Sequence, residues 1–463
     1  MYMKKHSPTT NMDDVLNKKE ALLYQQYLNE KYKREINKIE KSGTWKAGRI
    51  SRFFANIRAK MFGRLPSRKM YEQVIIENNQ LREQLLEQSA SLQQKSLYHE
   101  DMLSLERMQL LRELKNSGQL YSHLNETLSS FEKYRTDMKE TLVQIARLYM
   151  NEEPELKAYM YEQILNILPT EDIPEFMIRI GIEKDVPLTS TASFRGSLAA
   201  RMRQAQYFPR LPEWQLDDKK SAYSFVEQFK IKVPHTNNYS YDIASLPLQE
   251  GIVIKPVNGA GGRGVYIVHD DKWIIDVKES SDFQGFDELR SRMYRDLEIG
   301  AVAEDSWFIE EIIYENKQEK LAGRDLKFYT FYGKVGLILE IIRYPEMRYC
   351  WWDSNLNRIS VGKYDEQLFI GEGVTKEELQ MVEELSEQIP APFIRIDFLR
   401  SEYDLVFGEF TPKPGNYDEF NKEVDQRLGD DYLKAQVRLD MDLINGKQFE
   451  QFNAYRKDLI IRS

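Results

Sequence analysis

The spacing of hydrophobic residues changes near the middle of this chain. Over residues 70–150, apolar side chains recur at alternating three- and four-residue intervals, which is typical of a coiled-coil helix. From Asp217 onward, short apolar segments are separated by Gly, Pro and Asn, which is typical of strands joined by turns and helices. The pattern therefore predicts an α+β fold in the C-terminal half, preceded by a long N-terminal coiled-coil helix region.

The coiled-coil region begins after Leu65-Pro66-Ser67, which ends any preceding helix. Asn78 occupies an a position, where a polar residue favours one register and a low oligomer number. We therefore expect a homo-oligomer, most simply a dimer. The alternative is an antiparallel hairpin within one chain, because Asn116-Ser117-Gly118 can form a turn. The a and d positions, before and after a slip near residues 95–99, are Tyr71, Val74, Asn78, Leu81, Leu85, Leu92, Leu103, Leu110, Leu114, Tyr121, Leu124, Leu128, Phe131, Met138, Leu142 and Ile145.

Residues 41–70 contain nine Lys or Arg and no acid, although the whole chain carries a formal net charge of −9. A basic helix with an apolar face can lie in the headgroup region of an anionic membrane. We therefore predict that residues 45–62 bind an anionic membrane surface. The alternatives are packing on the helix's own domain and nucleic-acid binding, which the acidic remainder of the chain disfavours. The apolar face comprises Ile50, Phe53, Phe54, Ile57 and Met61, with Trp45 at its start.

Composition indicates the compartment. Cys350 is the one cysteine of the chain, which excludes an internal disulfide and fits a reducing environment. The first 15 residues have no apolar core typical of a signal peptide, and no apolar run has the length of a membrane span. We therefore expect a cytoplasmic protein, peripheral on the inner face of the plasma membrane if the basic helix binds lipid.

Residues 252–266 are the most informative stretch for function. A strand-like run ends in Lys255 and Pro256, a segment with four glycines follows, and strand-like residues resume at Val265. We predict two strands joined by a flexible loop whose backbone amides can close over phosphates; a purely structural glycine turn is the alternative. A dinucleotide fingerprint requires a helix after the glycines, and a Walker A loop requires Lys and Ser or Thr after Gly264. Neither His-Arg-Asp nor Asp-Phe-Gly of protein kinases is present.

Charged residues recur within the other predicted elements of this half. Asp217-Asp218 precede a helix that is expected to run from Lys219 to Lys232, and Trp307–Ile313 reads as an apolar strand containing two acids. Asp325, Lys327 and Tyr329 alternate onto one strand face. Arginines in residues 190–203 could meet an anionic substrate, but a solvated loop is the favoured interpretation there.

Two acids face each other across a predicted hairpin of residues 393–398 and 405–411. Asp397 shares a strand face with Arg395, and Glu409 shares one with Thr411. Paired carboxylates are unfavourable unless they are neutralised, which Mg²⁺ with nucleotide phosphates achieves. The alternative is an ion-pair network with Arg395.

The order of these elements resembles the ATP-grasp superfamily: a lysine at a helix start, Ile-Lys-Pro with a glycine loop, an Ile-Glu-Glu hinge, and paired carboxylates. Asp218-Lys219, Asp325-Leu-Lys327-Phe-Tyr, Arg395-Ile-Asp397-Phe and Phe407-Gly-Glu409-Phe-Thr411 resemble the TupA-like ATP-grasp group, which is associated with bacterial cell-surface polysaccharide and teichuronopeptide synthesis. The resemblance covers about 215–435. It implies two α+β subdomains that hold ATP and Mg²⁺ between them.

The resemblance also implies a role for each matching residue. The α- and β-phosphates would be held by Lys219 and Lys255, and the γ-phosphate would be covered by Gly259, Gly261, Gly262 and Gly264. Adenine and ribose would be framed by Glu310, Glu311 and Ile313. Lys327 and Arg395 would act on the transferring phosphoryl group, and Asp397 and Glu409 would bind magnesium. Many members carry an Asn two residues after the metal-binding Glu, where this chain has Thr411, so the third ligand is open between Thr411 and Asn416.

The function implied is an ATP- and Mg²⁺-dependent carboxylate–amine ligase that acts through an acylphosphate on glycan or small-molecule substrates of the cell surface. The alternatives are a kinase of a glycan or small alcohol, and a non-catalytic coiled-coil scaffold for glycan assembly. The expected domains are residues 1–70 (basic amphipathic segment), 71–150 (coiled coil), 151–215 (helical transition region) and 216–463 (ATP-grasp domain).

Overall fold

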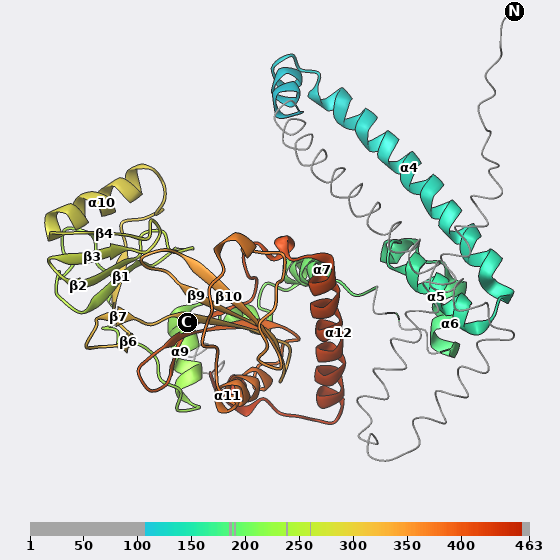
Figure 1. Ribbon diagram of the computed structural model, residues 1–463. Helices are drawn as coiled ribbons and strands as arrows, with labels where there is room; N and C mark the ends of the chain where they lie inside the picture. Colours follow the sequence, from blue (N-terminus) through green and yellow to red (C-terminus); the bar gives the residue numbers. More distant parts are fainter. Residues whose placement is uncertain (1–106, 185–187, 189–190, 238, 260, 456–463) are drawn as a thin grey trace, which may run out of the picture. The chain divides into compact units, whose positions relative to one another are not determined.

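The computed structural model describes residues 107–184, 188, 191–237, 239–259 and 261–455 (Figure 1). The predicted basic helix of residues 45–62 and residues 71–106 of the predicted coiled coil lie outside these described residues. The chain divides between Val186 and Pro187 into two units. Among the described helices, none is both long enough and apolar enough to span a membrane.

The described residues of the first unit are mostly helical. They begin with helical residues 107–116, which end in a turn at Ser117 and Gly118. Gly118 has a φ of +76°, a left-handed conformation that glycine adopts without strain. α4 (Leu120–Leu148) follows, then η1 (Tyr149–Asn151), α5 (Pro154–Leu165), η2 (Thr170–Asp172) and α6 (Glu175–Lys184). The predicted continuous helix is therefore interrupted at the turn that the hairpin alternative requires.

The two halves of α4 differ in what they contact within the described part of this unit. Arg135 binds Asp172 at 2.7 Å and Glu171 at 2.6 Å, and Ala146 is fully buried. The first half of the helix instead exposes its a and d side chains, with exposed fractions of 73% for Tyr121 and 61% for Phe131. The dimer predicted from this spacing stays a prediction.

The second unit contains two antiparallel five-stranded sheets (Figure 1). The first sheet has the order β4-β3-β2-β1-β5 and is built from β1 (Ile252–Pro256), β2 (Tyr266–Asp270), β3 (Trp273–Asp276), β4 (Ser281–Phe283) and β5 (Trp307–Glu311). α10 (Phe286–Glu298) buries Leu289 and Met293 against Ile252 and Ile254 on one face. The alternation of side chains along β1 therefore directs Lys255 to the other face.

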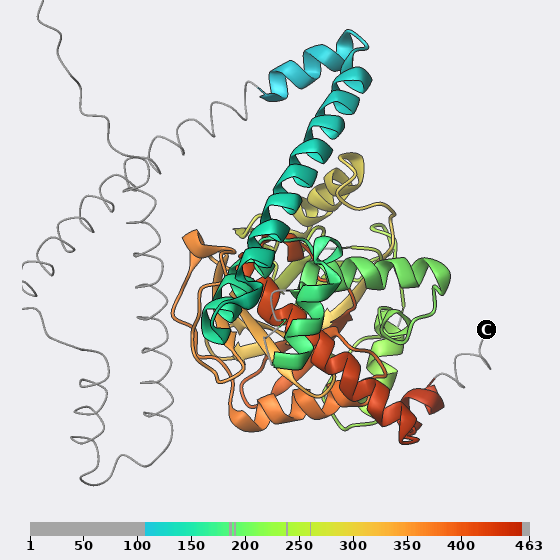
Figure 2. The ribbon, with the colours of Figure 1, turned by 90° about the vertical axis from the view of Figure 1, so that its right-hand side faces the viewer.

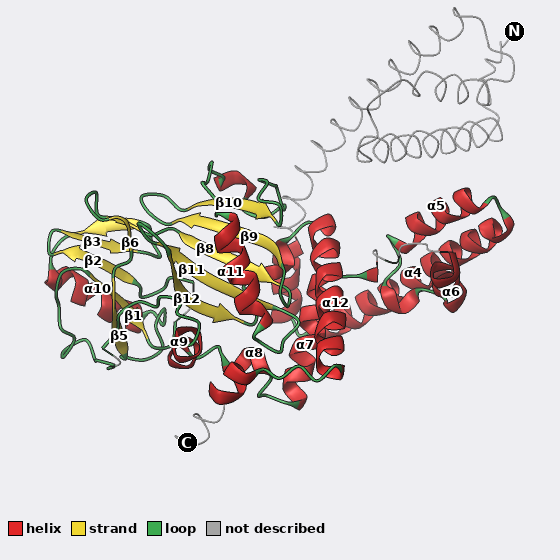
Figure 3. Ribbon diagram, turned by 90° about the horizontal axis from the view of Figure 1, so that it is seen from below, coloured by secondary structure: helices red, strands yellow, loops and turns green. Residues whose placement is uncertain are grey.

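The second sheet has the order β10-β9-β8-β11-β12. Its strands are β8 (Asp325–Thr330), β9 (Val335–Ile342), β10 (Arg348–Asp353), β11 (Ile394–Arg400) and β12 (Leu405–Thr411). Figure 3 shows α11 (Lys376–Glu387) lying across these strands, and α9 (Lys219–Glu227) packs against β12. A small hairpin of β6 (Tyr314–Asn316) and β7 (Leu321–Ala322) connects the two sheets along the chain.

Helices that flank the second sheet complete its core. α12 (Lys422–Ile444), the long red helix of Figure 2, packs beside α7 (Phe194–Tyr207). Phe194 of α7 reaches Tyr329, Phe331 and Phe393 of the sheet region. Other short elements of the described residues include α8 (Pro212–Gln215), η4 (Asp365–Gln367) and η5 (Tyr417–Glu419).

Two sequence expectations about helices are wrong. The solvated loop expected within residues 190–203 is α7, which Ser193 caps by accepting from the Gly196 amide at 3.0 Å. The helix expected to continue to Lys232 ends at Glu227, and Lys230 has a φ of +60° that no helix accommodates. Local sequence patterns suggested both expectations. The structure differs because Ser193 caps α7 and because a turn at Lys230 follows the end of α9.

Candidate functional site

A buried carboxylate brings together two lysines from separate elements of the second unit. Glu310 of β5 is 2% exposed and forms an ion pair with Lys255 of the neighbouring strand β1. Lys219, the first residue of α9, lies 3.8 Å from Oε1 of Glu310, with its Nζ 4.6 Å from the centre of the Phe308 ring. Tyr223, one turn further along α9, donates to the same Oε1 at 2.8 Å. The sequence predicted both lysines but not their common partner.

The charges of this cluster are unequally stabilised. Burial lowers the pKa of Lys219 to about 8, and the like charge of Lys255 acts in the same direction against the opposing effect of Glu310. Burial alone would raise the pKa of Glu310, but Lys255 and Lys219 hold it at about 2. One carboxylate is therefore surrounded by two ammonium groups. The excess positive charge makes the cluster suited to an anion.

The glycine loop between β1 and β2 lies at the end of the strand that carries Lys255. Gly261, Gly262 and Gly264 have φ values of +67°, +78° and +68°, which side-chain-bearing residues rarely adopt. A Cβ on Gly264 would lie 2.5 Å from Val302 and 3.2 Å from the Trp307 ring. Backbone conformation therefore requires glycine at positions 261, 262 and 264, and close packing also requires it at 264. Both the predicted phosphate loop and the structural turn are consistent with this. Gly259 would likewise place a Cβ 2.6 Å from Pro256.

A second charged cluster lies on three adjacent strands of the second sheet. Asp397 of β11 stands directly opposite Lys327 of β8 and Glu409 of β12. Arg395 donates to both carboxylate oxygens of Asp397 at 2.7 Å, and Lys327 forms an ion pair with Oδ2. Arg395 also donates to Oγ1 of Thr411 at 3.0 Å and approaches Glu409 to 3.9 Å. All four predicted charged residues of this sheet are thus brought together.

Burial differs sharply between the two acids of this cluster. Asp397 is 4% exposed, and although burial opposes its charge, Arg395 and Lys327 hold its pKa at about 2. Asp397 in turn raises the pKa of Arg395 against the effect of burial. The side chain of Glu409 is 46% exposed, so it is the open carboxylate of the pair.

The donor set fits a magnesium ion that is shared with phosphate oxygens. Mg²⁺ is usually bound through one or two carboxylates plus phosphates and water, and this site supplies Asp397 and Glu409. Among the described residues, no group of three or more His, Cys, Asp or Glu could hold a metal by itself. Oδ2 of Asp397 is already bound by Lys327 and Arg395, so a cation there would compete with Lys327. The carbonyl of Asn416, the other candidate ligand, accepts from Lys363 at 2.6 Å.

Long-range charge effects connect the two clusters. The Glu409 carboxylate of the second sheet opposes the lowering of the Lys219 pKa at the first cluster. It also contributes, after burial, to the raised pKa of Asp217, two residues before Lys219. Such coupling requires the groups to be near each other. The lysines and the acidic hairpin therefore lie close enough for their charges to interact.

The hinge between the sheets borders a cavity of 550 Å³. Glu311, Ile312 and Ile313 line it on one side, and the β11–β12 turn at residues 401–403 lines it on another. Glu311 and Ile313 thus line this cavity, and their role in framing adenine and ribose stays a prediction. Glu310 does not line this cavity, because neighbouring residues of a strand point to opposite faces. Instead it holds the two lysines.

Sequence reasoning missed two further residues of the site. Tyr223 could have been found from its position one helical turn after Lys219. Arg343, which follows β9, binds Asp325 and interacts with the charges of Glu409 and Asp397. No local pattern marked Arg343, because its partners come from other strands.

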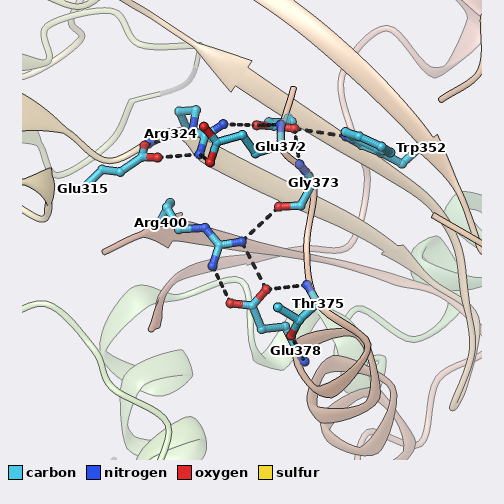
Figure 4. A network of polar contacts seen from close by, with 9 residues as sticks. Glu315, Arg324, Trp352, Glu372, Gly373, Thr375, Glu378 and Arg400 are labelled. Carbon is cyan, nitrogen blue, oxygen red and sulfur yellow. Dashed lines mark hydrogen bonds and ion pairs between the residues drawn. The ribbon is translucent and has the colours of Figure 1, made fainter. Parts of the chain in front are cut away.

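The opposite face of the second sheet carries a separate polar network (Figure 4). Glu340 shares its face with Leu326, its register partner, and therefore lies on the face opposite Lys327. It is fully buried and accepts from Arg324, from the Trp352 ring at 3.0 Å and from the Gly373 amide at 3.0 Å. Arg324 also binds Glu315 of β6 and thereby ties the hinge hairpin to this sheet. The network is structural and separate from the candidate site.

Comparison with known proteins identifies the fold. A family model described as TupA-like ATPgrasp matches residues 196–433. D-alanine–D-alanine ligase from Bacillus anthracis is similar in structure at 16% identity and a TM-score of 0.30, covering 49% of this chain and 69% of that chain. The ATP-grasp ligase PsnB with its minimal precursor gives 10% identity and a TM-score of 0.29, covering 57% and 75%.

D-alanine–D-alanine ligase from Helicobacter pylori gives 13% identity and a TM-score of 0.28, covering 49% of this chain and 58% of that chain. No curated protein sequence matches this chain. TM-scores this low carry no argument about activity, so the assignment depends on the family model, whose match spans just over half of the 463 residues. This chain belongs to the TupA-like ATP-grasp family.

Proposed function

We propose that this protein is an ATP- and magnesium-dependent carboxylate–amine ligase that acts in the synthesis or modification of bacterial cell-surface polysaccharide. In this reaction a phosphoryl group passes from ATP to a carboxylate, and an amine then displaces phosphate from the acylphosphate to give an amide. ATP supplies the phosphoryl group, and magnesium bound with it neutralises phosphate charge. The observation that carries the proposal is the proximity of the Lys219–Lys255 cluster to the cluster of Arg395, Asp397 and Glu409 in a member of this family.

The lysines would hold the phosphates by charge and position. Glu310 keeps Lys255 and Lys219 on one side of the first sheet, where each ammonium retains donors beyond those it gives to this carboxylate. An anion that binds there replaces water around a buried charge, which strengthens the interaction. The ammonium of Lys219 gains most, because burial disfavours its charge in the free protein.

Arg395 and Lys327 would stabilise the charge that develops during phosphoryl transfer. Both are fixed by Asp397, so their donors are oriented before any substrate binds. Preorganised donors of this kind lower a barrier because they need little reorganisation during reaction. Asp397 is thus a positioning residue for both cations, and Glu409 supplies the open carboxylate for magnesium.

Phosphate release by the full-length protein tests the proposal. The assay combines ATP and Mg²⁺ with pairs of candidate substrates, namely amino acids or uronic acids as carboxylates and amino sugars or amino acids as amines. The expected result is phosphate release that requires both an acid and an amine. ADP formation with an alcohol and without an amine would instead establish the kinase. Full function of Asp397→Asn and Glu409→Gln in cells would establish the scaffold.

The proposal includes assembly and location. We propose a homo-oligomer formed through the N-terminal helices, in a cytoplasmic protein that binds an anionic membrane surface through residues 45–62. The heptad spacing that exposes Tyr121, Leu124, Leu128 and Phe131 on α4 supports the oligomer. Sedimentation of the full-length chain, with Leu124→Glu as the variant, tests it; a monomeric wild type would overturn it.

A further inference from the structure

Arg343 lies at the end of β9, close to the carboxylates of the second sheet. Its Nε donates to Asp325, which follows the hinge hairpin at the start of β8. The side chain as a whole remains 29% exposed, so it is not fully enclosed by the protein. An arginine carries five N–H donors, so this one ion pair does not use its capacity.

The guanidinium also faces the glycine loop of the first sheet. A Cβ built on Gly262 would lie 3.7 Å from Nη1 of Arg343 and 3.3 Å from Val277. Gly262 itself has a φ of +78°, so its backbone approaches this cation without a side chain between them. The loop that covers phosphates in the proposed function and the guanidinium are therefore neighbours.

The segment that carries Arg343 is fixed from the first sheet. The hydroxyl of Tyr344 donates to Asp282 of β4 at 3.0 Å, and its ring lies 6.3 Å from that of Trp273 in β3. Asp325 holds Arg343 from the second sheet. Contacts from both sides reduce the side-chain entropy that a flexible arginine would lose on binding a ligand.

The surrounding charges keep this group cationic. Burial acts against the charge, but Asp325, Glu409 and Asp397 together raise the pKa of Arg343. The acids that are proposed to hold magnesium thus also act on the charge of Arg343. A guanidinium can bind two oxygens of one phosphate at once, which a lysine cannot do.

We propose that Arg343 is a phosphate-binding residue of this site, which contacts the terminal phosphate of ATP from the second sheet while the glycine loop covers it from the first. Asp325 acts on the ligand through Arg343 and is a positioning residue. The inference depends on the proposed nucleotide site and adds to it the cation that distinguishes a triphosphate from a diphosphate.

Binding measurements on the full-length protein test this inference. Titration calorimetry with Mg²⁺ would compare ADP with an ATP analogue that has a non-hydrolysable β–γ bridge. Arg343→Met is expected to bind the analogue about 10- to 100-fold more weakly, as for the loss of a charge-assisted hydrogen bond, and ADP nearly as well as wild type. Arg343→Lys should recover part of the lost affinity for the analogue. Asp325→Asn should also weaken binding of the analogue, but by a smaller factor.

A matched control and a second readout keep the test independent of stability. Arg348→Met removes a 53% exposed arginine that pairs with Glu346 nearby, and this variant should bind both nucleotides like wild type.

Amide exchange over residues 257–264 should slow when the wild-type protein binds the analogue. In Arg343→Met the analogue should slow this exchange much less. Equal affinities of wild type, Arg343→Met and Arg343→Lys for the analogue would overturn the inference. Failure of wild type to bind either nucleotide would overturn the proposed function itself.

Discussion

The two faces of the second sheet carry charged clusters that differ in completeness. On one face, Glu340 is fully buried and accepts hydrogen bonds from a guanidinium, an indole and two amides, those of Glu372 and Gly373 (Figure 4). On the other face, Asp397 is also buried, at 4% exposed, but the side chain of its neighbour Glu409 is 46% exposed. Across the site from it, the lysines share a single carboxylate.

The difference separates a structural network from a binding site. A buried charge is tolerated when its hydrogen bonds are made, and a network that is complete has nothing left for a ligand. The site face instead leaves an exposed acid, a lysine whose pKa is lowered and an arginine with unused donors. Such incompletely compensated charges are typical of functional sites.

Arg395→Met should give the largest effect on activity. It removes the guanidinium that holds both oxygens of Asp397, and loss of one preorganised donor lowers kcat by about 100- to 1000-fold. Phosphate release measures the loss. Arg400→Met, on the opposite face of the same strand, is the control because it breaks contacts with Glu378 and Gly373 only. Comparable losses of kcat per folded molecule in both variants would contradict the assignment of the two faces.

Glu340→Gln should give the largest effect on stability. It leaves Arg324 and the surrounding amides with a neutral partner in a fully buried position, which costs about 3 kcal/mol. Denaturant unfolding measures the change in the free energy of unfolding. Glu372→Gln, in the same network but with an 80% exposed side chain, should cost under about 1 kcal/mol. Nucleotide affinity of the folded Glu340→Gln protein should match wild type, and a large loss would connect this network to the site.

Glu409→Gln should weaken magnesium dependence with little change in stability. The half-exposed carboxylate has no short contact to lose, but as a metal ligand its loss should raise the Mg²⁺ concentration needed for half-maximal nucleotide binding about tenfold. Titration of Mg²⁺ at fixed nucleotide measures this. Glu377→Gln, an exposed acid in the first turn of α11, is the control. An unchanged Mg²⁺ requirement would remove Glu409 from the metal site.

Raising the pH should give the smallest effect. The pKa of Lys219 in the folded protein is about 8, below its ordinary value of 10.5. Between pH 8 and pH 10.5 the folded protein without nucleotide therefore loses this positive charge, while the unfolded chain keeps it. The free energy of unfolding should rise with pH through that window, because the unfolded state binds more protons. Nucleotide affinity should fall by up to about tenfold per pH unit above 8. Lys219→Met should remove this dependence; a persisting slope would assign it to another group.

The local elements of the site followed from short-range patterns. Alternation predicted the strands that carry Lys255, Lys327 and Asp397, and the short connection of residues 401–404 fixed the hairpin in which Asp397 meets Glu409. Glycines marked the loop because their backbone conformations exclude side chains. The family model then matched a region that includes all of these residues.

Tertiary structure decided which charges became partners. Glu310 meets Lys255 and Tyr223 across 55 and 87 residues of chain, and Arg343 meets Asp325 and the glycine loop from another strand. The sequence determined the faces on which side chains stand, because a strand repeats every two residues. It could not determine which faces meet, because that depends on how the two sheets pack, through contacts between residues far apart in the chain.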